Sequence, residues 1–442
     1  MSAPTDRTES SAQAIPFAYP FMGSEEEEAA IRVLRSGWLT TGREALEFEK
    51  EFAAALDPSG ESGLRALAVN SATSGLHLAL EACGVGPGDV VLTSPYTFTS
   101  TAEVIRYLGA DVAFVDVGPG SYLIDPDALD RTAARLAEGL SAYADGRGPT
   151  GRPVAVMPVH FAGLPCDMDA IARVAARHGL RVVEDAAHSF PSRFPDGRCA
   201  GALGDVGVFS FYATKTITTG EGGMVVTADP ELAARISVMR SHGIDRSIWN
   251  RYTDRKASWR YAVIEAGFKY NLPDLLAAVG RAQLAKAGRM LEMRRSIAAR
   301  YDQAFSSDPR FRTPPTGFAD ARHLYPLRLA AGMDAAGTDA AGTDAAGTDA
   351  AGRNRMIDAL QEAGIGTSVH FIPLHTMPYY AGRYKLRDGD FPNAMESFSA
   401  SLSLPIWPGM SDGQVDRVIA AVRAAAVRAA CREAAPSGRT PV

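Results

Sequence analysis

The chain has few cysteines and no long apolar run, and each shortage excludes a class of protein. Its four cysteines are widely spaced and form no Cys-x-x-Cys pair, which argues against a disulfide framework and a zinc site. No segment is long and apolar enough to span a bilayer. Residues 1–14 lack the cationic and apolar regions of a signal peptide. A reducing cytoplasm is therefore expected, and no metal.

The chain also lacks an excess of positive charge. Its net charge is −6 at pH 7, so it offers no basic stripe for nucleic acid and no polybasic patch for a membrane. A ligand that carries phosphate must therefore be held by a local site. With 442 residues and 46% hydrophobic content, the chain can bury a large core in two unequal domains.

Apolar strands alternate with amphipathic helices between residues 64 and 226. We expect strands at 67–69, 90–92, 112–115, 154–157 and 180–183, and helices from about 73, from about 97, after 126 and over 168–178. This alternation predicts an α/β fold whose mostly parallel sheet is covered on both faces. Ligands of such sheets gather at the carboxyl ends of the strands. The larger domain is expected over residues 16–275.

A smaller α+β domain is expected over residues 276–432. The pattern is helical as far as Phe305, and strand-like segments at 324–329 and 367–371 flank a helix over 353–363. Residues 334–352 repeat Asp-Ala-Ala-Gly-Thr three times and begin a fourth copy. Such an insert cannot pack a core, so we expect a surface loop. Frayed tails are expected at 1–15 and 433–442.

Lys215 is one of only six lysines among 45 basic residues. It lies on a short turn between two strand-like segments, five residues after Ser210 and shortly before Gly220-Glu221-Gly222-Gly223. Burial there would lower the pKa of its amine and favour Schiff base formation with a phosphorylated aldehyde. A lone lysine is usually a surface charge. Together with the motifs below, Lys215 indicates pyridoxal phosphate.

A phosphate site is expected where Asn70-Ser71-Ala72-Thr73-Ser74-Gly75 joins a strand to a helix. Hydroxyls and free amides at a helix N-terminus attract anions, although an ordinary helix cap is the alternative. With Ser210 and Lys215, we interpret this cluster as a phosphate cup.

Three further residues suit a pyridine ring. A carboxylate at Asp185 would keep a ring nitrogen protonated, through a charge-assisted bond worth roughly 1.5–3 kcal/mol, and so make the ring an electron sink. His188 could bind the ring's phenolic oxygen, and Phe98 could stack on its face. A helix cap, a structural histidine and a core aromatic are the respective alternatives.

These residues resemble the sugar aminotransferase family of pyridoxal phosphate enzymes called DegT/DnrJ/EryC1/StrS. The resemblance runs from about Pro16 to Ala425 and is interrupted by the repeat insert. Within the family, the chain is most similar to bacterial enzymes that aminate the 4-keto position of nucleotide sugars, including the one that forms UDP-4-amino-4-deoxyarabinose. The motifs that carry the resemblance are Ser36-Gly37-Trp38-Leu39-Thr40-Thr41-Gly42, Gly86-Pro87-Gly88-Asp89, Glu184-Asp185-Ala186-Ala187-His188, Phe209-Ser210-Phe211, Gly220-Glu221-Gly222-Gly223, Phe268-Lys269-Tyr270-Asn271-Leu272 and Gly364-Ile365-Gly366-Thr367-Ser368-Val369-His370-Phe371.

The resemblance implies fold type I and a role for each matching residue. Lys215 would carry the cofactor and move protons, Asp185 would pair with the ring nitrogen, and Phe98 would stack. The other implied contacts are Thr73, Ser74 and Ser210 to the phosphate, Asn271 to the phosphate of a neighbouring subunit, and Trp38, Thr40, His370 and Phe371 to the sugar side. A homodimer with shared active sites follows. Plain packing is the alternative for Trp38, and an ordinary strand end for His370 and Phe371.

The expected reaction moves an amino group from glutamate to a keto sugar of a nucleotide-diphosphate sugar. His188 favours C4, because many enzymes that form 3-amino sugars carry glutamine at that place. The alternatives are aminotransferases for a 3-keto sugar, a cyclitol or an aminobenzoate precursor, a dehydratase of the same fold, and a regulatory homologue without turnover. Lys215 argues against the dehydratase, which carries histidine there. The arginine-rich stretch 245–260 would either bind a diphosphate or form a solvated loop.

Overall fold

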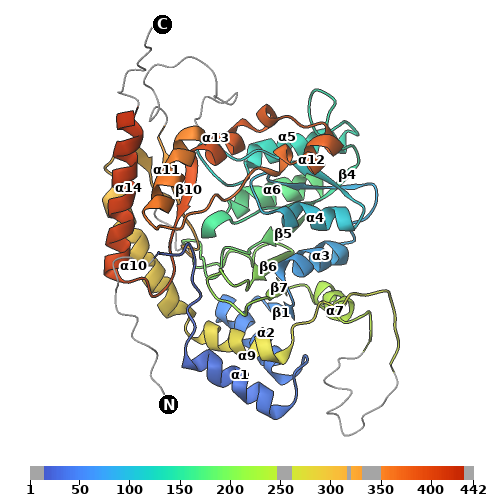
Figure 1. Ribbon diagram of the computed structural model, residues 1–442. Coiled ribbons are helices and arrows are strands. Elements are labelled where there is room, and N and C mark those ends of the chain that lie inside the picture. The colour runs from blue at the N-terminus through green and yellow to red at the C-terminus, as the bar shows by residue number, and fades with distance from the viewer. Residues whose placement is uncertain (1–13, 246–260, 316–319, 331–349, 433–442) are drawn as a thin grey trace.

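The computed structural model describes residues 14–245, 261–315, 320–330 and 350–432. Its larger sheet has the strand order β1-β7-β6-β5-β4-β2-β3 (Figure 1). The strands are β1 (Arg65–Val69), β2 (Asp89–Thr93), β3 (Asp111–Phe114), β4 (Arg152–Met157), β5 (Arg181–Asp185), β6 (Val206–Ser210) and β7 (Gly223–Thr227). Only β7 is antiparallel to its neighbours; the other adjacent pairs are parallel. The predicted α/β class and the five expected strands are confirmed.

Helices cover both faces of this sheet, because consecutive strand residues point to opposite sides. Val91 and Val112 pack in one buried cluster with α3 (Ala72–Ala82) and α4 (Thr99–Tyr107). Val90 and Ala113 pack in another cluster with α5 (Pro126–Ala137) and α6 (Met168–His178). The near-continuous apolar strands seen in the sequence reflect this two-sided burial. Among the helices of the described ranges, none combines the length and apolar character that a membrane crossing requires.

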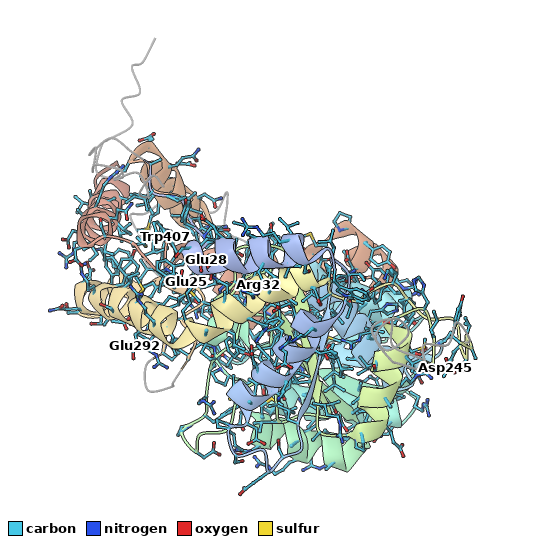
Figure 2. The ribbon with its side chains drawn as sticks, turned by 90° about the horizontal axis from the view of Figure 1, so that it is seen from below. Glu25, Glu28, Arg32, Asp245, Glu292 and Trp407 are labelled. Carbon is cyan, nitrogen blue, oxygen red and sulfur yellow. The ribbon has the colours of Figure 1, made fainter. Side chains whose placement is uncertain are left out.

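Three helices form a layer that packs on strand β1 through one of them, the helix of residues 43–56. They are α1 (Ser24–Ser36), α2 (Arg43–Leu56) and α9 (Asp274–Ala285), and α9 contacts the other two. Figure 2 shows Glu25, Glu28 and Arg32 on α1, which runs alongside α9. The expected domain boundary between residues 275 and 276 would cut α9. We therefore propose that the larger domain ends after this helix. Helix α7 (Pro230–Met239) follows β7 and packs on β1.

The rest of the chain forms a second, smaller unit. Its antiparallel sheet has the order β10-β9-β8. The elements are α10 (Ala287–Phe305), β8 (Phe311–Arg312), β9 (Tyr325–Leu329), α11 (Ala350–Glu362), α12 (Pro378–Tyr384), α13 (Pro392–Ala400), β10 (Ser401–Leu404) and α14 (Asp412–Arg432). Buried residues such as Tyr301, Leu327 and Val418 give this unit a hydrophobic cluster of its own. This arrangement supports the α+β unit that the sequence predicts.

Two expected segments differ from those in the structure. The predicted strand at 367–371 is wrong: only Ser368 pairs, through an isolated bridge to Ser403. His370 and Phe371 both line the cavity described below, which the alternating sides of a regular strand would not allow. The expected tail at 1–15 is too long, because Ile15 is buried and bonded to Gly364 and Gly366.

The repeat insert lies between β9 and α11, and most of it is outside the described residues. Its expected end at 352 is wrong, because α11 begins at Ala350 and buries Gly352. A helix that packs on α13 and α14 extends into the repeat because alanine is the strongest helix former. The expected tail at 433–442 and residues 246–260 of the arginine-rich stretch also lie outside the described residues.

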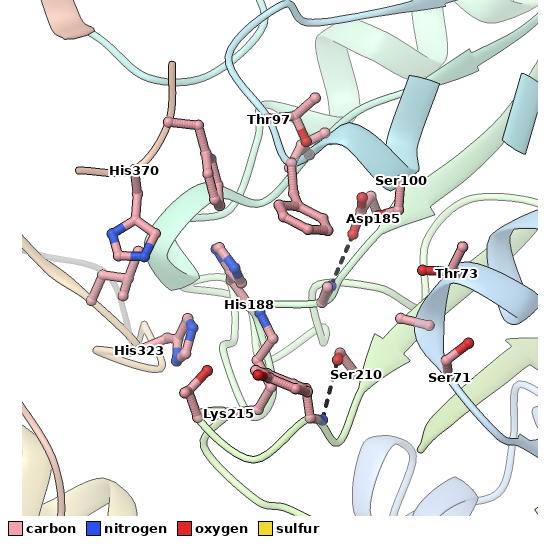
Figure 3. Close-up of a pocket in the computed structure, with 18 of the residues that line it drawn as sticks. Ser71, Thr73, Thr97, Ser100, Asp185, His188, Ser210, Lys215, His323 and His370 are labelled. Carbon is pink, nitrogen blue, oxygen red and sulfur yellow. Dashed lines mark hydrogen bonds between the residues drawn. The ribbon is translucent and has the colours of Figure 1, made fainter. Parts of the chain in front are cut away.

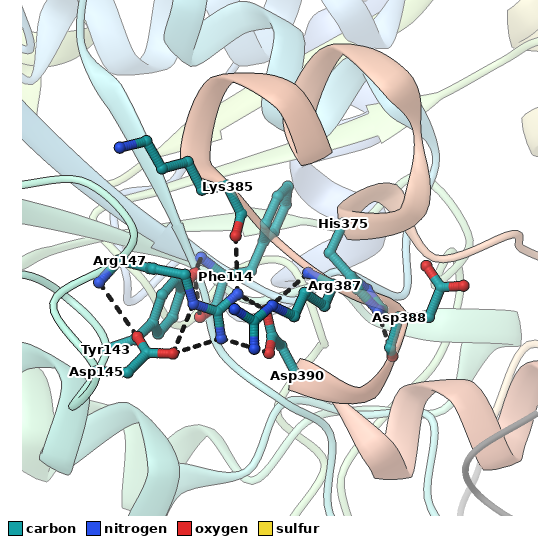
Figure 4. Close-up of polar contacts among 9 residues, drawn as sticks. All are labelled: Phe114, Tyr143, Asp145, Arg147, His375, Lys385, Arg387, Asp388 and Asp390. Atoms are coloured by element: carbon teal, nitrogen blue, oxygen red, sulfur yellow. Dashed lines mark hydrogen bonds and ion pairs between the residues drawn. The ribbon is translucent and has the colours of Figure 1, made fainter.

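Arg147 connects the two units at the far end of the sheet (Figure 4). It lies in the loop after α5, and its Nη2 donates to Asp390 Oδ1 at 2.6 Å. Its Nη1 also donates to the carbonyl of Lys385 at 2.8 Å. Both acceptors belong to the segment after α12, so this arginine fixes the C-terminal segment against the larger unit.

The Asp274 carboxylate caps α2 from a distant part of the chain. It is 3% exposed, and it accepts from the amides of Gly42 at 2.6 Å and Ala45 at 3.0 Å. An Asp274→Ala change leaves these buried amides without a partner, so it should destabilise the fold by about 1–3 kcal/mol. The measurement is the melting temperature by calorimetry. The control is Asp125→Ala, which removes a more exposed cap of α5 and should lower the melting temperature less. An equal or larger drop in the control would contradict the expectation.

Candidate functional site

A cavity of about 460 Å³ opens at the carboxyl ends of the central strands. Its walls come from the segments after β1, β2, β5 and β6, and from the smaller unit (Figure 3). This is the edge at which the sequence predicts a ligand. Eight of the predicted residues line the cavity: Thr73, Phe98, Asp185, His188, Ser210, Lys215, His370 and Phe371.

Lys215 lies on the turn that follows β6. Its backbone amide donates to the carbonyl of Tyr212 at 2.9 Å, which closes the turn and directs the side chain into the cavity. The side chain is partly exposed to that cavity. Burial of the amine by the surrounding protein still lowers its pKa to about 8, although the Asp185 carboxylate opposes the shift. About a tenth of the amine is therefore neutral at pH 7, far more than for a lysine with an unperturbed pKa, and the neutral form is the nucleophile.

Asp185 is the last residue of β5 and is almost fully buried. Its Oδ2 accepts from the Thr101 hydroxyl at 2.8 Å, and its Oδ1 accepts from the Ala187 amide at 3.1 Å. Burial raises the pKa of this carboxyl, whereas the two hydrogen bonds and Lys215 lower it. Thr101 and the Ala187 amide thus hold the carboxylate in place at the edge of the cavity, where the charge of Lys215 stabilises its ionised form.

The neighbouring Glu184 anchors the end of the same strand. Its Oε2 lies 2.8 Å from His160 Nε2, and both side chains are fully buried. His160 Nδ1 accepts from the Cys166 amide at 3.0 Å, so the ring proton must be on Nε2 and is donated to Glu184. Glu184 also accepts from the amides of Gly201, Leu203 and Gly204. This network fixes the strand end that positions Asp185.

One side of the cavity is lined by hydroxyl groups. Ser71, Thr73, Ser100 and Ser210 lie there, close to the N-termini of α3 and α4. Ser71 caps α3 by accepting from the Ser74 amide at 3.1 Å. Hydroxyls together with the first amides of a helix suit a phosphate group.

Four predicted residues are not among the described residues that line the cavity: Ser74, Trp38, Thr40 and Asn271. The Ser74 hydroxyl is buried and lies 2.7 Å from Asn70 Oδ1, so it serves the helix start instead. Asn271 Nδ2 donates to Thr41 Oγ1 at 2.6 Å, which places Asn271 beside the segment that carries Trp38 and Thr40. These three residues thus form a separate group on the same chain.

The opposite side of the cavity is lined by imidazoles. His188 Nδ1 accepts from the Ala162 amide at 3.3 Å, and His370 Nδ1 lies 2.9 Å from Ser403 Oγ. Burial and the charge of Lys215 lower the pKa of His188 well below its usual value and that of His370 to about 4. Both rings are therefore neutral at pH 7.

Sequence patterns missed several residues of the site. His323 lines the cavity just before β9, and its ring centroid lies 4.4 Å from that of His188. Phe17 and Glu221 line it as well. Tyr96 is fully buried and donates to the carbonyl of His370 at 2.6 Å. For His323 the sequence contained only one signal, its place before a predicted strand.

The arrangement of polar groups suits pyridoxal phosphate. Hydroxyls and a helix N-terminus offer a phosphate site on one side, a buried carboxylate offers a partner for a protonated ring nitrogen, and a lysine of lowered pKa can hold the aldehyde. All three lie around one cavity. The donor set therefore fits the cofactor that the sequence indicates.

Comparisons with known proteins agree with this assignment of the cofactor. The DegT/DnrJ/EryC1/StrS aminotransferase family matches residues 20–423. The chain is 44% identical over 415 residues to the spore coat polysaccharide biosynthesis protein SpsC of Bacillus subtilis, covering 92% of this chain and 96% of that protein. The aminotransferase TlmJ from Streptoalloteichus hindustanus is 33% identical, with a TM-score of 0.77 and coverage of 94% and 99%. The PLP form of the putative sugar aminotransferase Spr1654 from Streptococcus pneumoniae is 26% identical, with a TM-score of 0.79 and the same coverage.

The lowered pKa of Lys215 predicts how cofactor-free protein reacts with added pyridoxal phosphate. Only the neutral amine attacks a carbonyl, so the rate should rise with pH through about 8 and then level off. Asp185→Asn removes the negative charge that favours the charged amine, so the midpoint should move to lower pH. The measurement is the rate of appearance of the visible absorption band. Asp125→Asn, outside the cavity lining, should leave the midpoint unchanged; an upward shift in Asp185→Asn would contradict the assignment.

Proposed function

The chain belongs to the DegT/DnrJ/EryC1/StrS aminotransferase family and is a pyridoxal-phosphate-dependent aminotransferase; we propose that it moves the amino group of glutamate to C4 of a nucleotide-diphosphate 4-keto sugar. The observation that carries the proposal is the amine of Lys215 facing the buried carboxylate of Asp185 in a cavity with a hydroxyl side and an imidazole side. His188, in place of a glutamine, supports C4.

Each side chain has a proposed task. Bound pyridoxal phosphate supplies the electron sink and carries the amino group between the two substrates. Thr73, Ser210 and the amides at the start of α3 bind its phosphate, Asp185 binds its ring nitrogen, and Phe98 covers its face. Lys215 Nζ takes a proton from the α-carbon of glutamate and, in the second half-reaction, gives a proton to C4 of the sugar. His370 and Phe371 face the sugar.

We also propose a homodimer with shared active sites. Two large aromatic side chains that line the cavity are exposed: Phe98 is 58% exposed and Tyr212 is 48% exposed. Exposed apolar groups that cluster in this way are typical of an interface. Asn271, Trp38 and Thr40, which lie apart from their own chain's cavity, would then serve the cavity of the second subunit.

The cytoplasm is the compartment that we propose. The unpaired Cys83, Cys166 and Cys199 support this reducing compartment.

Removal of the Lys215 amine tests the catalytic assignment. Lys215→Ala should abolish transamination, because no other group supplies both cofactor attachment and proton transfer. Borohydride reduction of the loaded native protein should attach a pyridoxyl group to Lys215. Since this blocks tryptic cleavage at that residue, mass spectrometry should find the modified peptide 199–235. Turnover by Lys215→Ala at a normal rate would refute the proposal.

The acceptor is tested with the pyridoxamine phosphate form of the enzyme. We expect UDP- or dTDP-4-keto-6-deoxyglucose to restore the absorption band of the aldehyde form, because C4 then receives the amino group. The corresponding 3-keto sugars are the control and should restore it far more slowly. Faster recovery of the absorption band with a 3-keto sugar would show that C3 is aminated. If a cyclitol ketone were the best acceptor, a nucleotide sugar would be excluded as the substrate.

Mixed dimers test the shared site. Asn271→Ala alone should lower activity by about tenfold or more, through loss of a bond to a charged phosphate. In a mixture with Lys215→Ala, half of the dimers contain one copy of each variant, and one of their two sites is intact. Steady-state assays should then recover about a quarter of native activity. If the activity of the mixture is no higher than the mean activity of the two variants measured separately, Asn271 does not act across an interface.

A further inference from the structure

The two sides of the cavity differ in chemistry, and this difference assigns them to different parts of the ligands. Figure 3 shows Ser71, Thr73, Ser100 and Ser210 on one side and His188, His323 and His370 on the other, with Lys215 below His188. The hydroxyl side has free amides that suit an anion. The imidazole side has neutral rings, which offer one donor and one acceptor each.

Of these three imidazoles, His323 has a buried ring nitrogen without a hydrogen-bond partner among the described residues. Its Nδ1 is buried and has no hydrogen-bond partner in the described part of the chain. His188 and His370, by contrast, already use their Nδ1 atoms to bind the protein. A buried nitrogen without a partner is unfavourable and calls for an explanation, such as a ligand that is not present.

The main chain of His323, in contrast to its ring, is held firmly. The buried Arg294 guanidinium donates through Nη1 to the carbonyls of His323 at 3.3 Å and Ile406 at 2.8 Å. Both His323 and Ile406 line the cavity. The main chain of His323 is thus fixed at the edge of the cavity, while its ring Nδ1 is left for another group.

We propose that His323 hydrogen-bonds an oxygen of the acceptor sugar in the second half-reaction, an inference that rests on the proposed function. The neutral ring suits a hydroxyl or carbonyl oxygen, whereas a diphosphate or the carboxylates of glutamate would call for a cation. Burial and the nearby cations Lys215 and Arg294 keep the pKa of His323 well below its usual value. In Figure 3 His188 lies between His323 and Asp185, so His188 is the imidazole on the cofactor side.

The chain offers a matched control for a change at His323. His375 is also a buried imidazole whose Nδ1 has no hydrogen-bond partner in the described residues. It lies in the segment shown in Figure 4, where its Nε2 contacts the carbonyl of Asp388 at 3.1 Å. It is not among the described residues that line the cavity. An effect on activity that comes only from removing a buried imidazole should therefore appear after a change at His375 as well as after a change at His323.

The experiment measures the two half-reactions separately by stopped-flow absorbance. Glutamate drives the first, and the second uses whichever of UDP- and dTDP-4-keto-6-deoxyglucose the native enzyme accepts. His323→Leu should slow the second half-reaction by about 10- to 100-fold, leave the first within about twofold and leave the cofactor absorption band unshifted. His323→Asn, which keeps a donor and an acceptor, should recover part of the loss. His375→Leu should change neither half-reaction.

Two results would overturn the role of His323 while the proposed function stands. One is an equal loss in both half-reactions or a shifted absorption band, which would place His323 against the cofactor. The other is an unchanged second half-reaction in His323→Leu. Failure of the native enzyme to react with glutamate, or with either nucleotide sugar, would instead overturn the proposed function and this inference with it.

Discussion

The burial of an amine and a carboxylate in one cavity is the constraint on which the site depends. Removal from water disfavours the charged form of both groups, and it lowers the pKa of Lys215 and raises that of Asp185. Each charge in turn stabilises the other. The balance leaves the amine of Lys215 with a pKa of about 8. A group that titrates close to neutral pH can both take and give a proton, as transamination requires of a single residue.

The parallel strands supply the geometry for this pair. Asp185 ends β5 and Lys215 follows β6, and because these strands are parallel neighbours, both side chains emerge at the same edge. The hydroxyl of Thr101 and the Glu184–His160 contact then hold the strand end in place. The hydroxyl side of the cavity comes from the starts of α3 and α4 and from the end of β6. One sheet edge therefore carries most of the cofactor site.

The smaller unit completes the cavity from the other side. It contributes His323, His370 and Phe371, and it is joined to the larger unit near the site by the Tyr96 hydroxyl and farther away by Arg147. The imidazole side therefore depends on how the two units pack together. The proposed acceptor side thus depends on the position of the smaller unit, whereas the cofactor side belongs to the sheet.

The sequence by itself determined the α/β sheet, the cavity edge, and the placement of Lys215, Asp185, Thr73 and Ser210, because each of these follows from a strand and the few residues after it. Only the tertiary structure decided that Ser74 turns inward to Asn70, that 367–371 is not a strand, and that His323 and Tyr96 belong to the site. The Ser74 contact is local but needs the exact conformation of the turn, whereas the other outcomes depend on contacts between segments that are far apart in the chain. Local periodicity and motif spacing contain no information about which distant surface a side chain will meet, and packing alone settles it.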